Sequence, residues 1–298
     1  LQLRRLENDA IKLIYPNPSL DVGQAQDIIK VSIQQFYGIE INDFAVSVAK
    51  TALWIAESQM LEETKDIFYA DWDFLPLKTY TNIHEGNALR MDWNEVIPSY
   101  ACHYIMGNPP FVSNTGRVSN KESHSKKMLT SEQSDERFEI FGKIGGILDY
   151  VACWYKKAAD MMKNTTIKTA FVATDSIVEG QQVGPLWEAL FNMGIDIDFA
   201  YRPFKWTSEA SQGATVYVVI VGFSYTKKNK PKFIFDNQKI LECSYINAYL
   251  LDADNIIIKS RSTPLCKVKS MKSGGKPVEG GYLIFNKKEK EEFVKKEP

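Results

Sequence analysis

The residues most able to do chemistry form one short string, Asn108-Pro109-Pro110-Phe111, which follows the strand-like residues 100–107. Each proline fixes its backbone φ near about −65° and carries no N–H, so the turn is rigid and its carbonyl oxygens remain acceptors. The Asn108 carboxamide supplies one more acceptor. The Asn108 oxygen and the Pro109 carbonyl can together accept both hydrogens of an exocyclic amine, while Phe111 stacks on the heterocycle that carries it. The pattern predicts a site that holds an amino nitrogen with its lone pair exposed.

Metal and disulfide chemistry find no support in the sequence. The four cysteines lie far apart and form no CxxC pair, so neither a zinc knuckle nor a disulfide framework is indicated. The three histidines, His84, His103 and His124, are equally scattered. We therefore predict no metal site and reduced cysteine thiols.

Apolar periodicity divides the chain into alternating strands and helices. The expected strands cover residues 36–41, 83–89, 100–107, 169–173, 195–201 and 215–223. The expected helices cover residues 1–14, 44–60, 148–162 and 183–193, and Asp43 is the expected N-cap of the second. This alternation predicts an α/β protein with a doubly wound, mostly parallel sheet, whose ligands gather beyond the carboxyl ends of the strands. The polar residues 114–137 are predicted to form a long loop.

Composition indicates one large folded domain with a small basic appendage. The 298 residues are 44% hydrophobic, which excludes disordered and collagen-like chains. No apolar run reaches the roughly 18–20 residues of a membrane helix, and residues 1–7 lack a signal-peptide core, so we expect a cytoplasmic protein. Residues 259–298 carry eleven Lys and Arg against five Glu, whereas residues 1–258 carry 25 basic and 32 acidic groups. We therefore place a domain boundary after residue 258, and the basic segment either holds a phosphate backbone or forms a solvated surface.

The Asn108–Phe111 string resembles the catalytic motif of S-adenosylmethionine-dependent amino-methyltransferases, and its NPPF form is typical of enzymes that methylate adenine N6 in DNA. The segment Gly38-Ile39-Glu40-Ile41-Asn42 resembles the second motif of that family. The resemblance implies that Glu40 binds the ribose hydroxyls of the cofactor and that Ile41 packs on its adenine. From the bare sequence, Glu40 reads equally well as a solvated carboxylate at the end of a strand.

The segment Gly86-Asn87-Ala88-Leu89 resembles the third motif of the family. This resemblance implies that Asn87 and Ala88 lie beside the adenine of the cofactor. The family usually has an acidic residue where Asn87 stands, so a hydrogen bond is kept here and a charge is lost.

The order of further segments is similar to that of the MmeI-like (type IIL/IIG) group of restriction-modification enzymes. The matching segments are residues 171–177, 180–183, 204–206 and 276–281. The resemblance implies a Rossmann-like class I methyltransferase fold, followed by the start of a DNA target-recognition region. It implies that Phe204, or alternatively Trp206, contacts a flipped-out adenine and that Asp175 supports the target pocket, although core packing or turn hydrogen bonding is an alternative role for each. Double-stranded DNA is the implied partner, S-adenosylmethionine the implied cofactor, and an endonuclease is often fused or associated in this group.

One motif of the family is missing. A Gly-rich turn that approximates DPACGSGNF should precede residues 1–14, and Gly142-Lys143-Ile144-Gly145-Gly146 does not replace it, because no convincing strand comes before it. We therefore expect a fragment of a DNA adenine-N6 methyltransferase that binds S-adenosylmethionine weakly or not at all by itself. The alternatives are a catalytically inactive DNA-binding module and an amino-methyltransferase acting on cytosine N4, RNA or protein. Cytosine-C5 methylation is disfavoured, because it relies on a Pro-Cys nucleophile and no proline precedes a cysteine.

Overall fold

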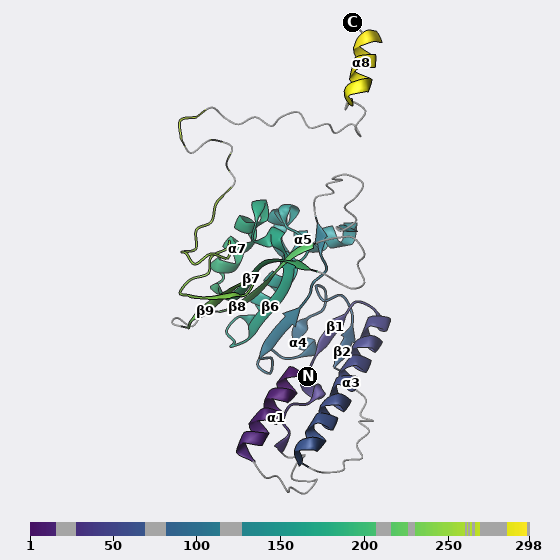
Figure 1. Cartoon of the computed structure of the whole chain (residues 1–298), viewed down its shortest axis with the longest axis vertical. Helices are drawn as coiled ribbons and strands as arrows, with labels where there is room; N and C mark the ends of the chain where they lie inside the picture. Colours follow the sequence, from purple (N-terminus) through teal and green to yellow (C-terminus); the bar gives the residue numbers. More distant parts are fainter. Residues whose placement is uncertain are drawn as a thin grey trace. The chain divides into compact units, whose positions relative to one another are not determined.

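The computed structural model describes residues 1–15, 28–68, 82–113, 127–206, 216–225, 230–259, 261, 263, 266–268 and 285–296. The chain divides into two compact units, Leu1–Ile257 and Ile258–Pro298, and each is described by itself. The first unit contains a six-stranded sheet with its helices, a smaller parallel pair of strands and two helices packed together, α1 and α3 (Figure 1).

The six-stranded sheet has the strand order β10-β9-β7-β8-β6-β3. Its strands are β3 (Tyr104–Gly107), β6 (Lys168–Thr174), β7 (Ile195–Trp206), β8 (Val216–Tyr225), β9 (Lys232–Asp236) and β10 (Lys239–Cys243). Strands β3, β6, β7 and β9 run in one direction, β8 lies antiparallel between β6 and β7, and β10 turns back along β9. The expected Rossmann-like, mostly parallel α/β sheet is confirmed.

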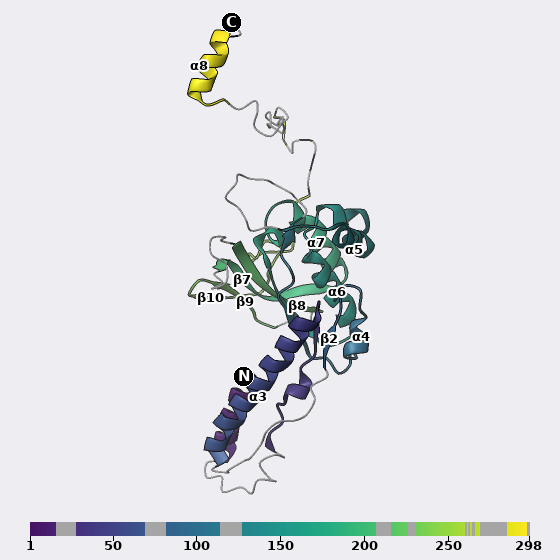
Figure 2. The ribbon, with the colours of Figure 1, turned by 90° about the vertical axis from the view of Figure 1, so that its right-hand side faces the viewer.

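Helices α6 (Ala152–Met162) and α7 (Val183–Asn192) cover one face of this sheet (Figure 2). Alternate residues of β6 and β8 point toward these helices, so Phe171 and Phe223 are buried against the ring of Tyr155. The Tyr155 and Phe223 rings are stacked with their centroids 5.2 Å apart. On the opposite face Gly222 makes room for the ring of Phe199, because a Cβ at position 222 would lie 2.1 Å from that ring.

A two-stranded sheet pairs β1 (Gly38–Glu40) in parallel with β2 (Ile83–Glu85), so Glu40 and Glu85 are neighbours at its carboxyl end. Helix α3 (Asp43–Phe68) begins two residues after β1 ends and runs beyond the predicted end at residue 60. The side-chain oxygen of Asn42 accepts a hydrogen bond from the Ala45 N–H at 2.8 Å. Asn42 therefore caps the helix, and the prediction of Asp43 as the cap is wrong by one residue.

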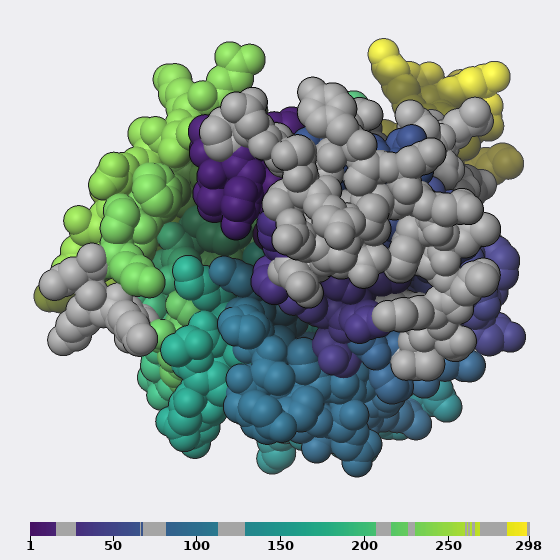
Figure 3. All heavy atoms as spheres, turned by 90° about the horizontal axis from the view of Figure 1, so that it is seen from below, coloured from purple at the N-terminus to yellow at the C-terminus, as the bar shows by residue number. Residues whose placement is uncertain are grey.

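Helix α1 (Gln2–Ile14) confirms the expected helix, but its apolar side does not face a core. The buried residues of α1 are Arg4, Asn8 and Ile11. The Thr64 hydroxyl of α3 accepts from Arg4 at 3.0 Å and donates toward the Asn8 amide oxygen at 3.1 Å. The apolar side chains Leu6 and Leu13 are 67% and 85% exposed. Atoms of α1 (purple) lie at the surface beside a recess that teal and green residues border (Figure 3).

The predicted loop over residues 114–137 is wrong at its C-terminal end. Strand β5 (Lys127–Met128) pairs in parallel with β4 (Val112–Ser113), and helix α5 (Ser131–Phe141) follows. Thr130 caps α5 and forms a reciprocal capping box with Gln133, which stabilises the start of the helix. The 3-10 helix η2 (Gly142–Ile147) comes directly after α5, so this glycine string follows a helix rather than a strand, as predicted. Residues 114–126 and the segment 276–281 lie outside the described residues.

Short elements complete the first unit: η1 (Ile33–Gln35), α4 (Trp93–Val96), η3 (Asp175–Ile177) and η4 (Gly180–Gln182). The second unit contains α8 (Lys287–Lys296), which is exposed throughout, and Phe285 stacks on Phe293 with ring centroids 5.0 Å apart. In the part of the chain that the structure describes, none of the helices has the length and hydrophobicity needed to cross a membrane.

Candidate active site

The predicted amine-binding turn lies at the carboxyl end of β3. Strand β3 pairs in parallel with β6, and its last residue, Gly107, is opposite Phe171 of the core. The Val112 N–H donates to the Pro110 carbonyl at 3.1 Å, which tightens the turn just after the prolines. The buried core under β3 therefore supports a short, rigid connection at the edge of the sheet.

The turn leaves the Asn108 side chain exposed. Pro109 is buried, Phe111 is half-buried and Asn108 is exposed. Within the described part of the chain, neither the Asn108 carboxamide nor the Pro109 carbonyl makes a hydrogen bond. Both acceptors therefore lack a partner among the described residues, and the exposed Asn108 carboxamide lies near the half-buried Phe111 in the same turn.

The residues predicted to contact the target base lie along the same edge of the sheet. Because β3, β6 and β7 run parallel, their carboxyl ends share one edge. Asp175 directly follows β6 and begins η3, and Phe204 and Trp206 lie at the end of β7. Trp206 is 38% exposed and Phe204 is half-buried, with their ring centroids 6.4 Å apart. Core packing does not account for Trp206, and strands β6 and β8 separate both rings from Asn108.

Glu40 ends β1 next to the turn that follows β2. Its carbonyl accepts a hydrogen bond from the Gly86 N–H at 2.7 Å, which joins the two turns. Its carboxylate is exposed and forms no hydrogen bond or ion pair with any described residue. Ile41, the next residue, is 65% exposed. A free carboxylate beside an exposed aliphatic side chain fits a ligand that presents hydroxyl groups next to an apolar ring.

Asn87 and Ala88 make the turn after β2 rigid. The Asn87 side-chain oxygen accepts from the Leu89 N–H at 2.9 Å, and its amide nitrogen donates to Glu136 at 2.7 Å. The Ala88 carbonyl accepts from the Trp93 indole N–H at 2.7 Å. Much of the hydrogen-bonding capacity of Asn87 is therefore used inside the protein.

The sequence analysis missed Glu136 of α5 and Tyr150. The buried Glu136 carboxylate accepts from Asn87, from Arg90 Nε at 2.6 Å and from the Tyr150 hydroxyl. Burial, followed by the hydrogen bond to Glu136, raises the pKa of Tyr150, so this hydroxyl remains a protonated donor. The Thr130 capping box is the sequence signal that could have found α5. Nothing in the sequence indicates which carboxylate of that helix is buried.

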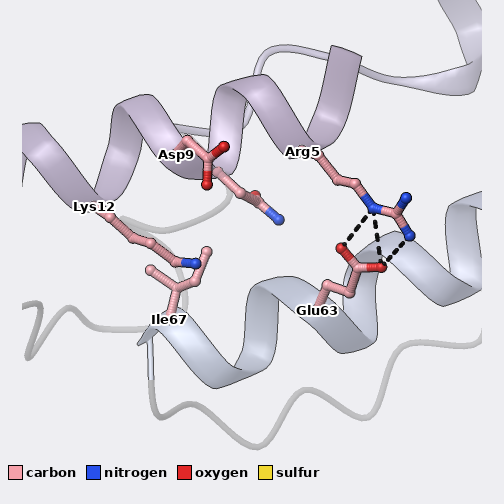
Figure 4. Close-up of a pocket in the computed structure, with 6 residues that line it drawn as sticks. Arg5, Asp9, Lys12, Glu63 and Ile67 are labelled. Atoms are coloured by element: carbon pink, nitrogen blue, oxygen red, sulfur yellow. Dashed lines mark hydrogen bonds and ion pairs between the residues drawn. The ribbon is translucent and has the colours of Figure 1, made fainter. Parts of the chain in front are cut away.

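A cavity of about 410 Å³ lies between α1 and α3 (Figure 4). Its lining contains none of the predicted site residues and consists of Arg5, Asn8, Asp9, Lys12, Glu63 and Ile67. The guanidinium of Arg5 is paired with the Glu63 carboxylate at 2.8 Å. This hydrogen-bonded pair raises the pKa of Arg5 and lowers the pKa of Glu63. Because these charges neutralise each other and the strand ends lie elsewhere, we place the candidate site at the strand ends.

Comparison with known proteins shows the family of the chain. The family model of the MmeI DNA-methyltransferase domain matches residues 1–236, and that of the MmeI target recognition domain matches residues 252–298. The chain is similar to DNA methyltransferase A of Bacillus subtilis (strain 168), with 40% identity over 304 residues that cover 100% of this chain and 32% of that protein. It is also similar to the solved structure of the type IIL restriction-modification enzyme MmeI in complex with DNA. That structure matches with a TM-score of 0.87 and 35% identity, over 99% of this chain and 39% of that one. The chain thus spans about a third of the length of these relatives.

Proposed function

Because the chain belongs to the family of MmeI DNA-methyltransferase domains, we propose that it is the catalytic part of a restriction-modification methyltransferase that methylates adenine N6 in double-stranded DNA. S-adenosylmethionine is the proposed methyl donor. The observation that carries the proposal is a pair of acceptors with no hydrogen-bond partner among the described residues, the Asn108 carboxamide and the Pro109 carbonyl, in the same turn as the half-buried Phe111.

The proposed substrate is an adenine rotated out of the duplex, because the paired and stacked base is out of reach. Base flipping costs a few kcal/mol, and stacking on Phe111 offsets roughly 1–3 kcal/mol of it. The Asn108 oxygen and the Pro109 carbonyl accept the two amine hydrogens and direct the nitrogen lone pair away from the turn. The same two dipoles stabilise the positive charge that develops on this nitrogen as its new bond to carbon forms. Phe204, with Trp206 as the alternative, is the proposed second aromatic contact of the base, and Asp175 the proposed support of its pocket.

Glu40 and Ile41 are the residues we propose to hold the cofactor. The Glu40 carboxylate suits the two ribose hydroxyls, and the exposed Ile41 side chain suits a face of the adenine ring. Asn87 and Ala88, in the turn joined to Glu40 through Gly86, complete this wall. When bound, the cofactor would supply a methyl carbon on a positively charged sulfur. The carbon–sulfur bond would break as the amine nitrogen bonds to that carbon, and the nitrogen would then lose one of its hydrogens as a proton to solvent. No side chain of this protein needs to carry the methyl group.

We also propose that a further strand with a Gly-rich turn completes the cofactor site. Among the described residues, β1 pairs only with β2, and β3 pairs only with β6. The side chains of Tyr104 and Met106 on β3 are 68% and 79% exposed. The unpaired edge of β3 among the described residues favours an additional strand beside it. Because parallel sheets normally have both faces covered, the exposed Tyr104 and Met106 side chains favour a further element over that face. Without the additional strand, we expect the 298-residue chain to transfer no methyl group.

For residues 259–298 we propose a basic linker and the start of a DNA target-recognition region. The division into compact units after Ile257 and the match of the target recognition model to residues 252–298 support this boundary. The excess of basic over acidic residues in residues 259–298 favours contact with the phosphates of a nucleic acid. DNA is accordingly the proposed partner, and a fused or associated endonuclease is proposed only for the longer protein.

The test offers DNA, RNA and protein in separate reactions to a longer protein that contains this chain, with a labelled methyl donor, and then identifies the labelled product and, in DNA, the methylated base. N6-methyladenine supports the proposal. N4-methylcytosine, methylated RNA or methylated protein would replace adenine with one of the alternative substrates. DNA binding without any transfer would show an inactive binding module.

A further inference from the structure

Glu136 connects the turn after β2 to the segment that follows the proposed catalytic turn, Asn108–Phe111. One oxygen of its buried carboxylate accepts from Asn87 at 2.7 Å and from Arg90 at 2.6 Å, and the other accepts from the Tyr150 hydroxyl. The Tyr150 N–H donates to the Val112 carbonyl at 3.1 Å. A chain of hydrogen bonds thus runs from the proposed cofactor wall through α5 to the first strand residue after Phe111.

Apolar packing reinforces this connection. The side chains of Leu89, Val112, Tyr150 and Cys153 form one buried cluster. Leu89 belongs to the turn after β2, and Val112 follows the catalytic turn, so the cluster lies directly under both. From α6, the Lys157 ammonium donates to the Leu89 carbonyl at 2.7 Å. The two turns are therefore held by the same small core, and Glu136 is its buried anion.

The arrangement explains why an amide stands at position 87. The Asn87 nitrogen supplies the hydrogen that lies between it and the Glu136 oxygen. A carboxylate at the same position would place two anionic oxygens within hydrogen-bond distance without a proton between them, next to a buried group. Arg90 is already paired with Glu136, and its single positive charge balances one carboxylate rather than two.

We propose that Glu136 is a positioning residue of the cofactor site, which fixes the turn after β2 relative to the catalytic turn and requires an amide at position 87. The proposal rests on the proposed function, because it assumes that this turn contacts S-adenosylmethionine. It makes Asn87 and Glu136 a matched pair. Exchanging amide and carboxylate between them keeps a hydrogen bond between positions 87 and 136 and moves the carboxylate available to Arg90 from position 136 to position 87, whereas changing Asn87 alone to a carboxylate breaks that hydrogen bond.

The experiment uses the longer protein with three variants, Asn87→Asp, Glu136→Gln and the double variant, and the exposed Glu139→Gln on the same helix as the matched control. The first measurement is the dissociation constant of S-adenosylmethionine by calorimetry. We expect Asn87→Asp to weaken binding about 10- to 100-fold, as expected for loss of a buried hydrogen bond to a charged group. The double variant is expected to recover to within a few-fold of the wild type. DNA affinity is expected to change little in all variants.

The second measurement needs no ligand. Amide hydrogen exchange of residues 86–91 reports the order of the turn, because the Leu89 N–H donates to Asn87 and the Arg90 N–H to the Asn87 carbonyl. We expect faster exchange in Asn87→Asp and restored protection in the double variant. If Asn87→Asp does not fold, refolding on addition of Glu136→Gln supports the proposal in the same way.

Two results overturn the proposal: unchanged cofactor affinity and exchange in Asn87→Asp, or a double variant that is no better than Asn87→Asp. A wild-type longer protein that does not bind S-adenosylmethionine, but retains protected amides at residues 86–91, would instead refute the proposed function. The two failures are therefore distinguishable.

Discussion

Asn108→Ala in the longer protein measures how much the Asn108 amide contributes to the rate of methyl transfer at the proposed catalytic turn. The substitution removes one of the two acceptors and leaves the Pro109 carbonyl in place. A hydrogen bond to a group that becomes charged contributes about 1.5–3 kcal/mol, so we expect kcat to fall about 10- to 150-fold. Because Asn108 is exposed and makes no hydrogen bond with described residues, we expect the free energy of unfolding to change by less than about 0.5 kcal/mol.

The assay is steady-state transfer of labelled methyl groups from S-adenosylmethionine to DNA, with urea denaturation of each variant. Asn192→Ala, at the exposed end of α7, is the matched control and is expected to keep the wild-type rate. A folded Asn108→Ala protein that methylates DNA at the wild-type kcat would refute the role of this turn. A loss of rate accompanied by an equal loss in the control would show that the effect is general.

Three further predictions concern other parts of the chain. Glu40→Gln in the longer protein is expected to weaken S-adenosylmethionine binding about 10- to 100-fold with little loss of stability, and unchanged affinity in calorimetry would exclude the ribose contact. Gly222→Ala forces a Cβ into the Phe199 ring and is expected to destabilise the protein by about 1–3 kcal/mol in urea denaturation, with partial recovery when Phe199→Leu is added; no recovery would mean that the ring is not the cause. Burial raises the pKa of Cys153 to about 12, whereas Cys266 is exposed. At pH 8 a thiol reagent is therefore expected to label Cys266 before Cys153 in the native protein. Equal labelling of the two cysteines in peptide mapping would contradict the burial of Cys153.

Most of the sheet could be predicted from the sequence, because its strands carry strong local signals. Strands β6 and β8 alternate or run apolar over seven and ten residues, and the structure places their apolar faces against α6 and α7. The proline pair after β3 marks the end of that strand, since neither residue can donate to a ladder. Strands whose signals lie in neighbouring residues could therefore be predicted from the sequence.

Features that depend on packing between distant parts of the chain could not be predicted from the sequence. Glu136 is one of several carboxylates on α5, and only the approach of Asn87, forty-nine residues earlier in the chain, makes it a buried acceptor. The apolar pattern of α1 predicted a helix correctly but not which side is covered, because Thr64 of α3 binds Arg4 and Asn8 instead. The Asn42 cap was misplaced by one residue, since Asn and Asp are both good caps and stand side by side.

The exposed leucines of α1 affect how the 298-residue chain associates in solution. The exposed side chains of Leu6 and Leu13 form an apolar surface on α1, whose opposite side packs on α3. This surface can bind the same surface of a second molecule. We expect concentration-dependent association in light scattering, reduced by Leu6→Lys and Leu13→Lys without loss of helicity. Purification of the 298-residue chain would then call for dilute samples.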